Sequence, residues 1–235
     1  MQHFFLKPEN FHGEQIEITE SPTLHQLTRV LRIKTGDELM VLDNSGDEFL
    51  CRIEQLNENK TRLRIIEKRK NAAEPEIFIT LYQSLPKKME LFEWVLQKGT
   101  EIGVSRFVPI KTERTQRHEF SKRDRLEKIL KEAAEQCERG KIPELIGAQK
   151  FTEALANADG QQKFILHGRG DHPLLSKVIT KQTSVDVFIG PEGGFTESEI
   201  QQAEKNGVII CSLGPRILRT ETAAIVATGI ILSHA

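Results

Sequence analysis

Two segments rich in glycine and proline constrain the fold of this chain more than any other feature. Residues 189–195 read IGPEGGF and residues 213–222 read LGPRILRTET. Each follows an apolar, β-branched run, at 185–189 and 208–213, and each leads into a helix-start signal. Glycine permits unusual backbone angles and close approach, and proline fixes a turn. Two such neighbouring corners predict an open, mostly parallel α/β sheet that binds its ligand at these loops.

The composition is typical of a folded protein and excludes several classes. The chain has 235 residues, 29% of them charged, and no apolar run long enough to cross a bilayer. Its three cysteines, Cys51, Cys137 and Cys211, lie far apart and form no CxxC pair. We therefore expect no disulfide framework and no metal site, and a cytoplasmic location.

The charge distribution permits an RNA partner without requiring one. The net charge is −1, which gives no overall attraction to nucleic acid. Basic residues nevertheless cluster at 60–70 and at 111–125. Either cluster fits a solvated face as well as an RNA-binding surface, and charge alone does not decide between the two.

The first 70 residues predict a small β-rich, barrel-like domain. Its expected strands lie at 15–19, 37–42, 49–53 and 61–66, with turn signals between them. A helix is expected over 21–32, entered through Ser21 and Pro22. The polar stretch at 68–75 is the expected linker.

The remainder of the chain, residues 76–235, alternates strands and helices. Strands are expected at 77–83, 106–110, 164–166, 185–189 and 208–213. Helices are expected at 87–102, from a capping box of Ser121 and Asp124 to Cys137, at 196–207 and at 221–232. This alternation predicts an α/β domain with helices on both faces of the sheet.

The loops exclude the common nucleotide and hydrolase motifs. The GPEGG segment lacks the Gly-Lys-Ser/Thr ending of a P-loop and the GxGxxG spacing of a dinucleotide site. No GxSxG elbow is present. With HGRG at 167–170, the two loops describe a pocket lined largely by backbone, which suits a flat heterocycle such as adenine.

These motifs resemble those of the bacterial small-subunit (16S) ribosomal RNA uridine-N3 methyltransferases of the SPOUT superfamily. GPEGGF and LGPRILRTETA carry the resemblance, and HQLTRVLR (25–32), KGTEIGV (98–104) and EAAEQCER (132–139) extend it over nearly the whole chain. The resemblance implies a PUA-like β-barrel RNA-binding domain at 1–70. It also implies a SPOUT α/β domain at 76–235, with a deep trefoil knot that binds S-adenosylmethionine, in a homodimer that acts on 16S ribosomal RNA or the small ribosomal subunit.

The resemblance also assigns the candidate site residues. The residues that match the three cofactor loops are Leu166, His167, Gly168, Gly190, Pro191, Glu192, Gly193, Leu213, Gly214, Leu218 and Thr220. Arg219 is expected to stabilise negative charge on the uracil, and Glu221 to accept the N3 proton or to hold Arg219. A structural alternative stays open, in which Thr220 caps the last helix and Glu221 complements its dipole.

RNA contacts are expected mainly on the first domain. The candidates are Arg29, Arg32, Lys34, Arg62 and Arg64, with Arg114 and Arg139 extending the surface on the second domain. Two other functions remain open: a SPOUT methyltransferase that acts on another RNA or base position, and a non-catalytic RNA-binding ribosome-assembly factor of the same fold. The intact GPEGGF and RTETA segments favour an enzyme.

Overall fold

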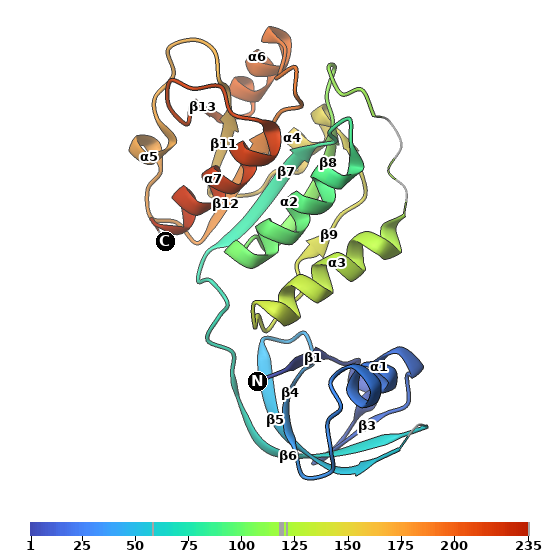
Figure 1. Cartoon of the computed structure of the whole chain (residues 1–235). Helices are drawn as coiled ribbons and strands as arrows, with labels where there is room; N and C mark the ends of the chain where they lie inside the picture. The colour runs from blue at the N-terminus through green and yellow to red at the C-terminus, as the bar shows by residue number, and fades with distance from the viewer. Residues whose placement is uncertain (58, 118–119, 121, 235) are drawn as a thin grey trace. The chain divides into compact units, whose positions relative to one another are not determined.

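The structure, a computed structural model, describes residues 1–57, 59–117, 120 and 122–234 and divides into two units (Figure 1). The first unit comprises Met1–Glu74 and Ala134–Ile142, and the second comprises Pro75–Ala133 and Pro143–Ala235. The first unit is therefore discontinuous in sequence. The expected cap at Ser121 lies outside the described residues.

The first unit is a curled, six-stranded sheet (Figure 1). In spatial order its strands are β1 (His3–Phe5), β4 (Glu38–Leu42), β5 (Asp47–Leu56), β6 (Thr61–Lys70), β3 (Gln15–Ile18) and β2 (Phe11–His12). Among the described residues of this unit, β1 and β4 pair in parallel and the other neighbouring strands pair antiparallel. The expected helix forms as α1 (Ser21–His25), which continues into a π-helical turn at Gln26–Val30, and a short 3-10 turn lies at Pro8–Asn10.

The linker begins three residues later than expected, because β6 extends to Lys70. Lys68, Arg69 and Lys70 belong to β6, where they pair with Phe49, Glu48 and Asp47 of β5. Lys68 and Lys70 form ion pairs with Asp47, and Arg69 forms one with Glu48. Opposite charges across the two strands therefore continue the pairing after the apolar alternation has ended.

Side-chain alternation builds the core of the first unit. Ile16, Ile18, Val41, Ile53 and Leu63 point inward and are at most 1% exposed. The apolar side of α1 and the turn after it closes this core through Leu24 and Leu27.

The later segment Ala134–Ile142 completes the first unit. A side-chain oxygen of Glu135 accepts a hydrogen bond from the Phe5 amide at 2.8 Å. The side chain of Ala134 packs with Phe5 and Leu42. The Ile142 amide donates to the side chain of Asn44 at 2.7 Å.

The second unit contains a parallel sheet, as predicted. In spatial order its strands are β10 (Gln149–Lys150), β8 (Arg106–Lys111), β7 (Phe78–Ser84), β12 (Ser184–Ile189), β11 (Gln162–Leu166) and β13 (Ile209–Cys211), with β9 (Glu144–Leu145) also paired to β8. Every described pair of these strands is parallel. Because β11 lies between β12 and β13, the loops that follow these three strands emerge at one edge of the sheet.

Helices cover both faces of this sheet (Figure 1). α2 (Met89–Ile102) and α7 (Thr220–Leu232) pack together on one face. α4 (Phe151–Asn157) and α6 (Glu197–Lys205) pack on the other, around a core that includes Tyr82, Ile165 and Phe188. The remaining helices are α3 (Arg123–Gln136) and α5 (Leu175–Val178). None of the helices in the described part of the chain is long and apolar enough to cross a membrane.

Candidate functional site

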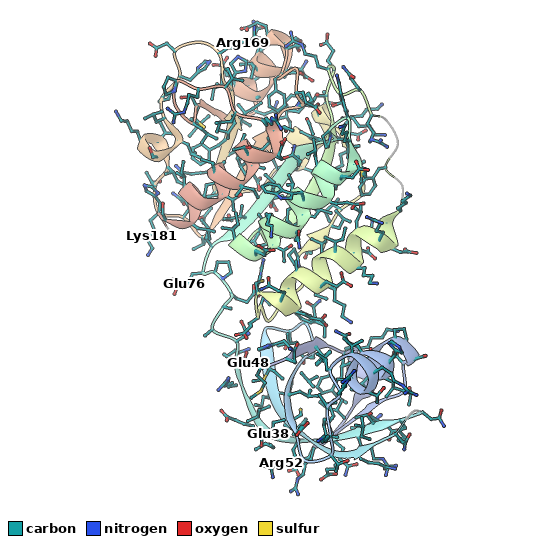
Figure 2. All side chains as sticks on the ribbon, viewed as in Figure 1. Glu38, Glu48, Arg52, Glu76, Arg169 and Lys181 are labelled. Carbon is teal, nitrogen blue, oxygen red and sulfur yellow. The ribbon has the colours of Figure 1, made fainter. Side chains whose placement is uncertain are left out.

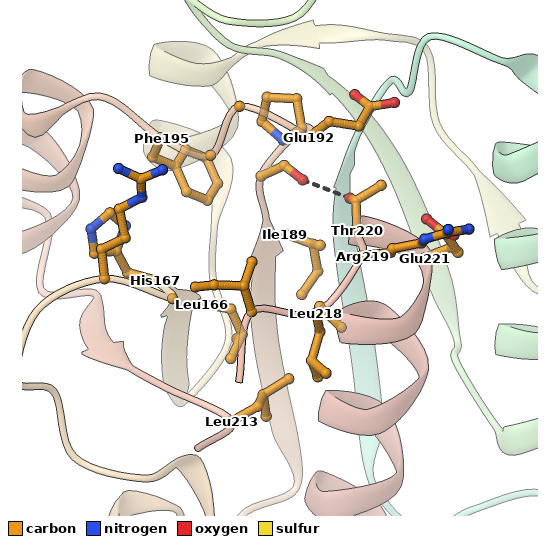
Figure 3. A pocket seen from close by; sticks show the side chains of 18 of the residues that line it. Leu166, His167, Ile189, Glu192, Phe195, Leu213, Leu218, Arg219, Thr220 and Glu221 are labelled. Atoms are coloured by element: carbon orange, nitrogen blue, oxygen red, sulfur yellow. Dashed lines mark hydrogen bonds between the residues drawn. The ribbon is translucent and has the colours of Figure 1, made fainter. Parts of the chain in front are cut away.

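A cavity of about 610 Å³ lies at the carboxyl ends of the neighbouring strands of the second unit (Figure 3). Its walls are the loops that follow β11, β12 and β13, the start of α7 and the segment between β7 and α2. The parallel sheet explains this placement, because the carboxyl ends of its strands all face the same edge.

The structure brings together all of the cofactor and catalytic residues selected from the sequence. Leu166, His167, Gly168, Gly190, Pro191, Glu192, Gly193, Leu213, Gly214, Leu218, Arg219, Thr220 and Glu221 all line this cavity. The sequence interpretation missed Lys87, Lys88 and Leu91, which also line it. They follow the predicted strand at 77–83, which forms as β7, and the predicted helix at 87–102 comes next. This further strand–loop–helix corner was the signal that could have found them.

Apolar side chains and close backbone approaches shape the cavity. Leu166, Ile189, Leu213 and Leu218 line its interior (Figure 3). A Cβ on Gly190 would lie 3.1 Å from the ring of Phe195, which is tighter than an ordinary contact. Glycine here therefore lets the loop after β12 fold back against an aromatic ring.

The hydroxyl of Thr220 joins two of the cavity loops. Its Oγ1 donates a hydrogen bond to the carbonyl of Gly190 at 2.6 Å (Figure 3). The N-cap of α7 is Arg219, with no side-chain cap, and Thr220 is the first helical residue. The alternative that Thr220 caps the last helix is therefore wrong, whereas Glu221 does lie in the first turn, where its charge complements the dipole.

Arg114 belongs to the same cavity. Its Nη1 donates to the carbonyl oxygens of Gly193 and Phe195 at 2.8 and 3.3 Å. The Lys87 amide donates to the Glu192 carboxylate at 3.1 Å. These bonds tie the loop after β12 to the segments that follow β8 and β7, and a second cavity of about 530 Å³ adjoins them.

His167 is set in an environment that disfavours its charged form. Burial lowers the pKa of its ring below 6.5, and the charges of nearby His172 and Arg169 lower it further. The rings of His167 and His172 lie edge to face, with centroids 5.4 Å apart. We therefore treat His167 as a neutral wall of the cavity at pH 7.

The candidate RNA contacts on the first unit are exposed. Arg29 and Arg32 lie in and just after the turn that continues α1, Lys34 follows them, and Arg62 and Arg64 lie on β6. Arg139 differs from them. It is 3% exposed, belongs to the first unit and donates to the carboxylate of Glu74.

Comparisons with known proteins agree with this architecture. The sequence profile of the RNA methyltransferase domain matches residues 73–232, and that of the RNA methyltransferase PUA domain matches residues 18–66. Together they define the class of protein: an RNA methyltransferase domain joined to a PUA domain.

Individual relatives specify the family within this class. Ribosomal RNA small subunit methyltransferase E of Bacillus subtilis is 32% identical and covers 98% of this chain and 96% of its own length. The structure of the Neisseria gonorrhoeae protein of that name, bound to S-adenosyl methionine, is 28% identical with a TM-score of 0.90, over 99% of this chain and 97% of that one. A Legionella pneumophila protein in complex with the cofactor SAM is 31% identical with a TM-score of 0.87, over 98% and 96%. The chain therefore belongs to the ribosomal RNA small subunit methyltransferase E family, as the sequence motifs indicated.

Proposed function

We propose that this protein transfers a methyl group from S-adenosylmethionine to N3 of a uridine in 16S ribosomal RNA. The observation that carries the proposal is one apolar, glycine-lined cavity. It is lined by all of the candidate cofactor and catalytic residues, in a family with members described as bound to this cofactor.

The cavity fits the cofactor in size and chemistry. Its volume of about 610 Å³ lies within the range of small-molecule sites. Leu166, Leu213 and Leu218 supply apolar walls for a flat ring, and the backbone at Gly168 and Gly190 supplies hydrogen-bonding groups. When bound, S-adenosylmethionine supplies an electrophilic methyl group.

The start of α7 supplies the groups that act on the uracil. Arg219 is exposed at the cavity and stabilises the negative charge that forms on the base as N3 loses its proton. Glu221, in the next position but one, accepts that proton or holds Arg219. Because N3 lies on the Watson–Crick edge, the target base must be unpaired or extruded before it reaches these groups.

We assign RNA recognition to residues 1–70 and catalysis to residues 76–235. The exposed cations Arg29, Arg32, Lys34, Arg62 and Arg64 provide the RNA-binding surface of the first domain. Arg114 adds a cation beside the cavity, whereas the buried Arg139 is not part of the proposed surface. A small-subunit RNA substrate also favours a cytoplasmic location.

We further propose that two copies of the chain pair through α7. This helix carries no basic residue and only one acidic residue, Glu221, and Val226 on it is 39% exposed. Trp94, on the neighbouring α2, is 40% exposed. A helix that is apolar on all sides is normally buried, and a second copy provides a self-complementary cover.

One assay tests substrate, cofactor and reaction together. The purified protein is incubated with labelled S-adenosylmethionine and small ribosomal subunits from cells that lack the endogenous enzyme, and modified nucleosides are mapped by mass spectrometry. We expect N3-methyluridine at one site in 16S ribosomal RNA. A different methylated nucleoside would refute the substrate, and the absence of both binding and transfer would favour a non-catalytic RNA-binding factor.

A further inference from the structure

A chain of buried hydrogen bonds joins the central strand β7 to the candidate cofactor cavity. Gln83, near the end of β7, is 1% exposed, and its Nε2 donates to the Ser84 carbonyl at 3.0 Å and to Thr220 Oγ1 at 2.9 Å. The Thr220 hydroxyl in turn donates to the Gly190 carbonyl at 2.6 Å. Strand β7, helix α7 and the loop after β12 therefore meet at one hydroxyl group.

The chemistry of the groups fixes the direction of this chain. The Ser84 carbonyl can only accept, so the Gln83 side chain must turn its NH₂ group toward it, and the same NH₂ group faces Thr220. The Thr220 oxygen accepts from Gln83, which leaves its one hydrogen for Gly190. Each donor thus has its acceptor, and the Gly190 carbonyl is held at the end of the chain.

The arrangement carries a cost for folding. Among the described residues, neither Oε1 of Gln83 nor Oγ of Ser84 has a hydrogen-bond partner, although both are buried. Unpaired buried polar atoms destabilise a fold, and such local costs are expected where function requires them. An apolar residue at position 83 would remove the unpaired Oε1, but also the hydrogen bond to Thr220.

We propose that Gln83 is a positioning residue for the cofactor loop. Through the Thr220 hydroxyl it holds the Gly190 carbonyl, and thereby the backbone of residues 190–194, in the conformation that binds S-adenosylmethionine. Gln83 is not among the residues that line the cavity, so it acts only through Thr220. The assignment rests on the proposed function, in which this loop contacts the cofactor.

The same helix offers a matched control. Thr228 also lies on α7, is 0% exposed, and donates its hydroxyl hydrogen to the Ala224 carbonyl at 2.9 Å. Thr228→Val therefore removes a buried hydroxyl from the same helix without breaking the chain that starts at Gln83.

The test compares cofactor affinity, measured by calorimetry, across Gln83→Met, Thr220→Val, Thr220→Ser and Thr228→Val. Gln83→Met and Thr220→Val should each weaken binding roughly 5- to 20-fold, because each breaks the buried hydrogen-bond chain that ends at the Gly190 carbonyl. Thr220→Ser keeps the hydroxyl and should restore most of the affinity, and Thr228→Val should leave it unchanged. The double variant Gln83→Met/Thr220→Val should bind no more weakly than the weaker single variant, because both break one chain.

Two further readouts separate positioning from general stability. The KM for S-adenosylmethionine should rise in Gln83→Met while kcat changes much less. Amide hydrogen exchange at residues 190–194, measured without cofactor, should become faster in Gln83→Met and not in Thr228→Val. If Gln83→Met fails to fold, Thr220→Val breaks the same chain from its other end.

The outcomes distinguish this assignment from the proposed function. Wild-type affinity in both Gln83→Met and Thr220→Val, or an equal loss in Thr228→Val, would overturn the role of Gln83. If the unmodified protein does not bind S-adenosylmethionine, the proposed function fails. The positioning role of Gln83 is tested separately, because unchanged hydrogen exchange at residues 190–194 in Gln83→Met would refute it whether or not the cofactor binds.

Discussion

The guanidinium of Arg139 makes two hydrogen bonds, of 3.1 and 3.0 Å, with the carboxylate of Glu74, which lies 65 residues earlier in the chain. The Arg139 side chain is 4% exposed and that of Glu74 is 20% exposed. Glu74 also accepts a hydrogen bond from the Lys141 amide at 3.0 Å. This pair therefore fastens the segment Ala134–Ile142 to the rest of the first unit.

Replacing Arg139 should destabilise the protein. Arg139→Met leaves the Glu74 carboxylate without its main partner, and we expect the free energy of unfolding to fall by about 3 kcal/mol. Urea unfolding measures the change. The control is Arg52→Met, which breaks an exposed pair with Glu38 and should change stability by less than about 1 kcal/mol. Equal effects of the two substitutions would contradict the structural role of Arg139.

A methyl group at position 190 should weaken cofactor binding. The added Cβ of Gly190→Ala would meet the ring of Phe195 at 3.1 Å and push the loop after β12 out of place. We expect an affinity loss of about tenfold, typical of a crowded site. Gly147→Ala is the control, because a Cβ there has no heavy atom within 4 Å. Calorimetric titration with S-adenosylmethionine compares them, and undiminished affinity in Gly190→Ala would count against the proposed loop.

Removing Arg219 should impair transfer without affecting cofactor binding. In Arg219→Ala the charge that forms on the uracil loses its stabilising partner, and kcat should fall about 100-fold. Lys181→Ala serves as control, because Lys181 precedes β12 and lies at the edge of the second unit (Figure 2). Single-turnover methylation and calorimetry separate the two effects. Full activity in Arg219→Ala would exclude the catalytic assignment.

Acidification should destabilise the protein through His167. Since burial lowers the pKa of this ring below 6.5, the unfolded chain takes up its proton at a higher pH than the folded protein does. The contribution of neutral His167 to the free energy of unfolding is fully present above pH 6.5. It should therefore be lost as the pH falls from 6.5 to the lowered pKa. Thermal unfolding of the wild type and His167→Gln across this interval measures the effect, which the variant should reduce. Identical pH profiles for the wild type and His167→Gln would contradict the expectation.

A charge on α7 should separate the two copies of the proposed dimer. Val226→Glu places a carboxylate on the exposed apolar side of the helix, where pairing would bury it without a partner. Sedimentation velocity should show a dimer for the wild type and a monomer for the variant. Ile66→Glu, at a 46% exposed position on β6, is the control and should remain dimeric. A monomeric wild type would refute the pairing.

The long elements and the cavity could be predicted because their signals are local. The helix that ends at Gly103 and the strands before the two glycine-rich loops carry clear periodicity and turn chemistry. They form as α2, β12 and β13, and β13 is shorter than expected. The short elements β1, β2, β9, β10, α4 and α5 were missed. Strands of two or three residues contain too few side chains to show a period, and β1 depends on distant β4 for its pairing.

Partners far apart in sequence were the other source of error. Arg139 looks like any basic residue of an RNA surface until Glu74 is placed beside it. Gln83 looks like an ordinary strand residue, because its acceptor Thr220 comes 137 positions later. Such pairs follow from the folded topology, which composition and spacing do not contain.

Because the first unit is discontinuous in sequence, it cannot finish folding early during synthesis of the chain. In the segment Ala134–Ile142, Glu135 accepts from the Phe5 amide and Arg139 donates to Glu74. This segment comes much later in the chain than Phe5 and Glu74. Because a chain leaves the ribosome from its N-terminus, the six strands of the first unit emerge well before these contacts can form. The first unit can therefore complete its folding only once residue 142 has emerged, when β7, α2, β8 and α3 have already been synthesised.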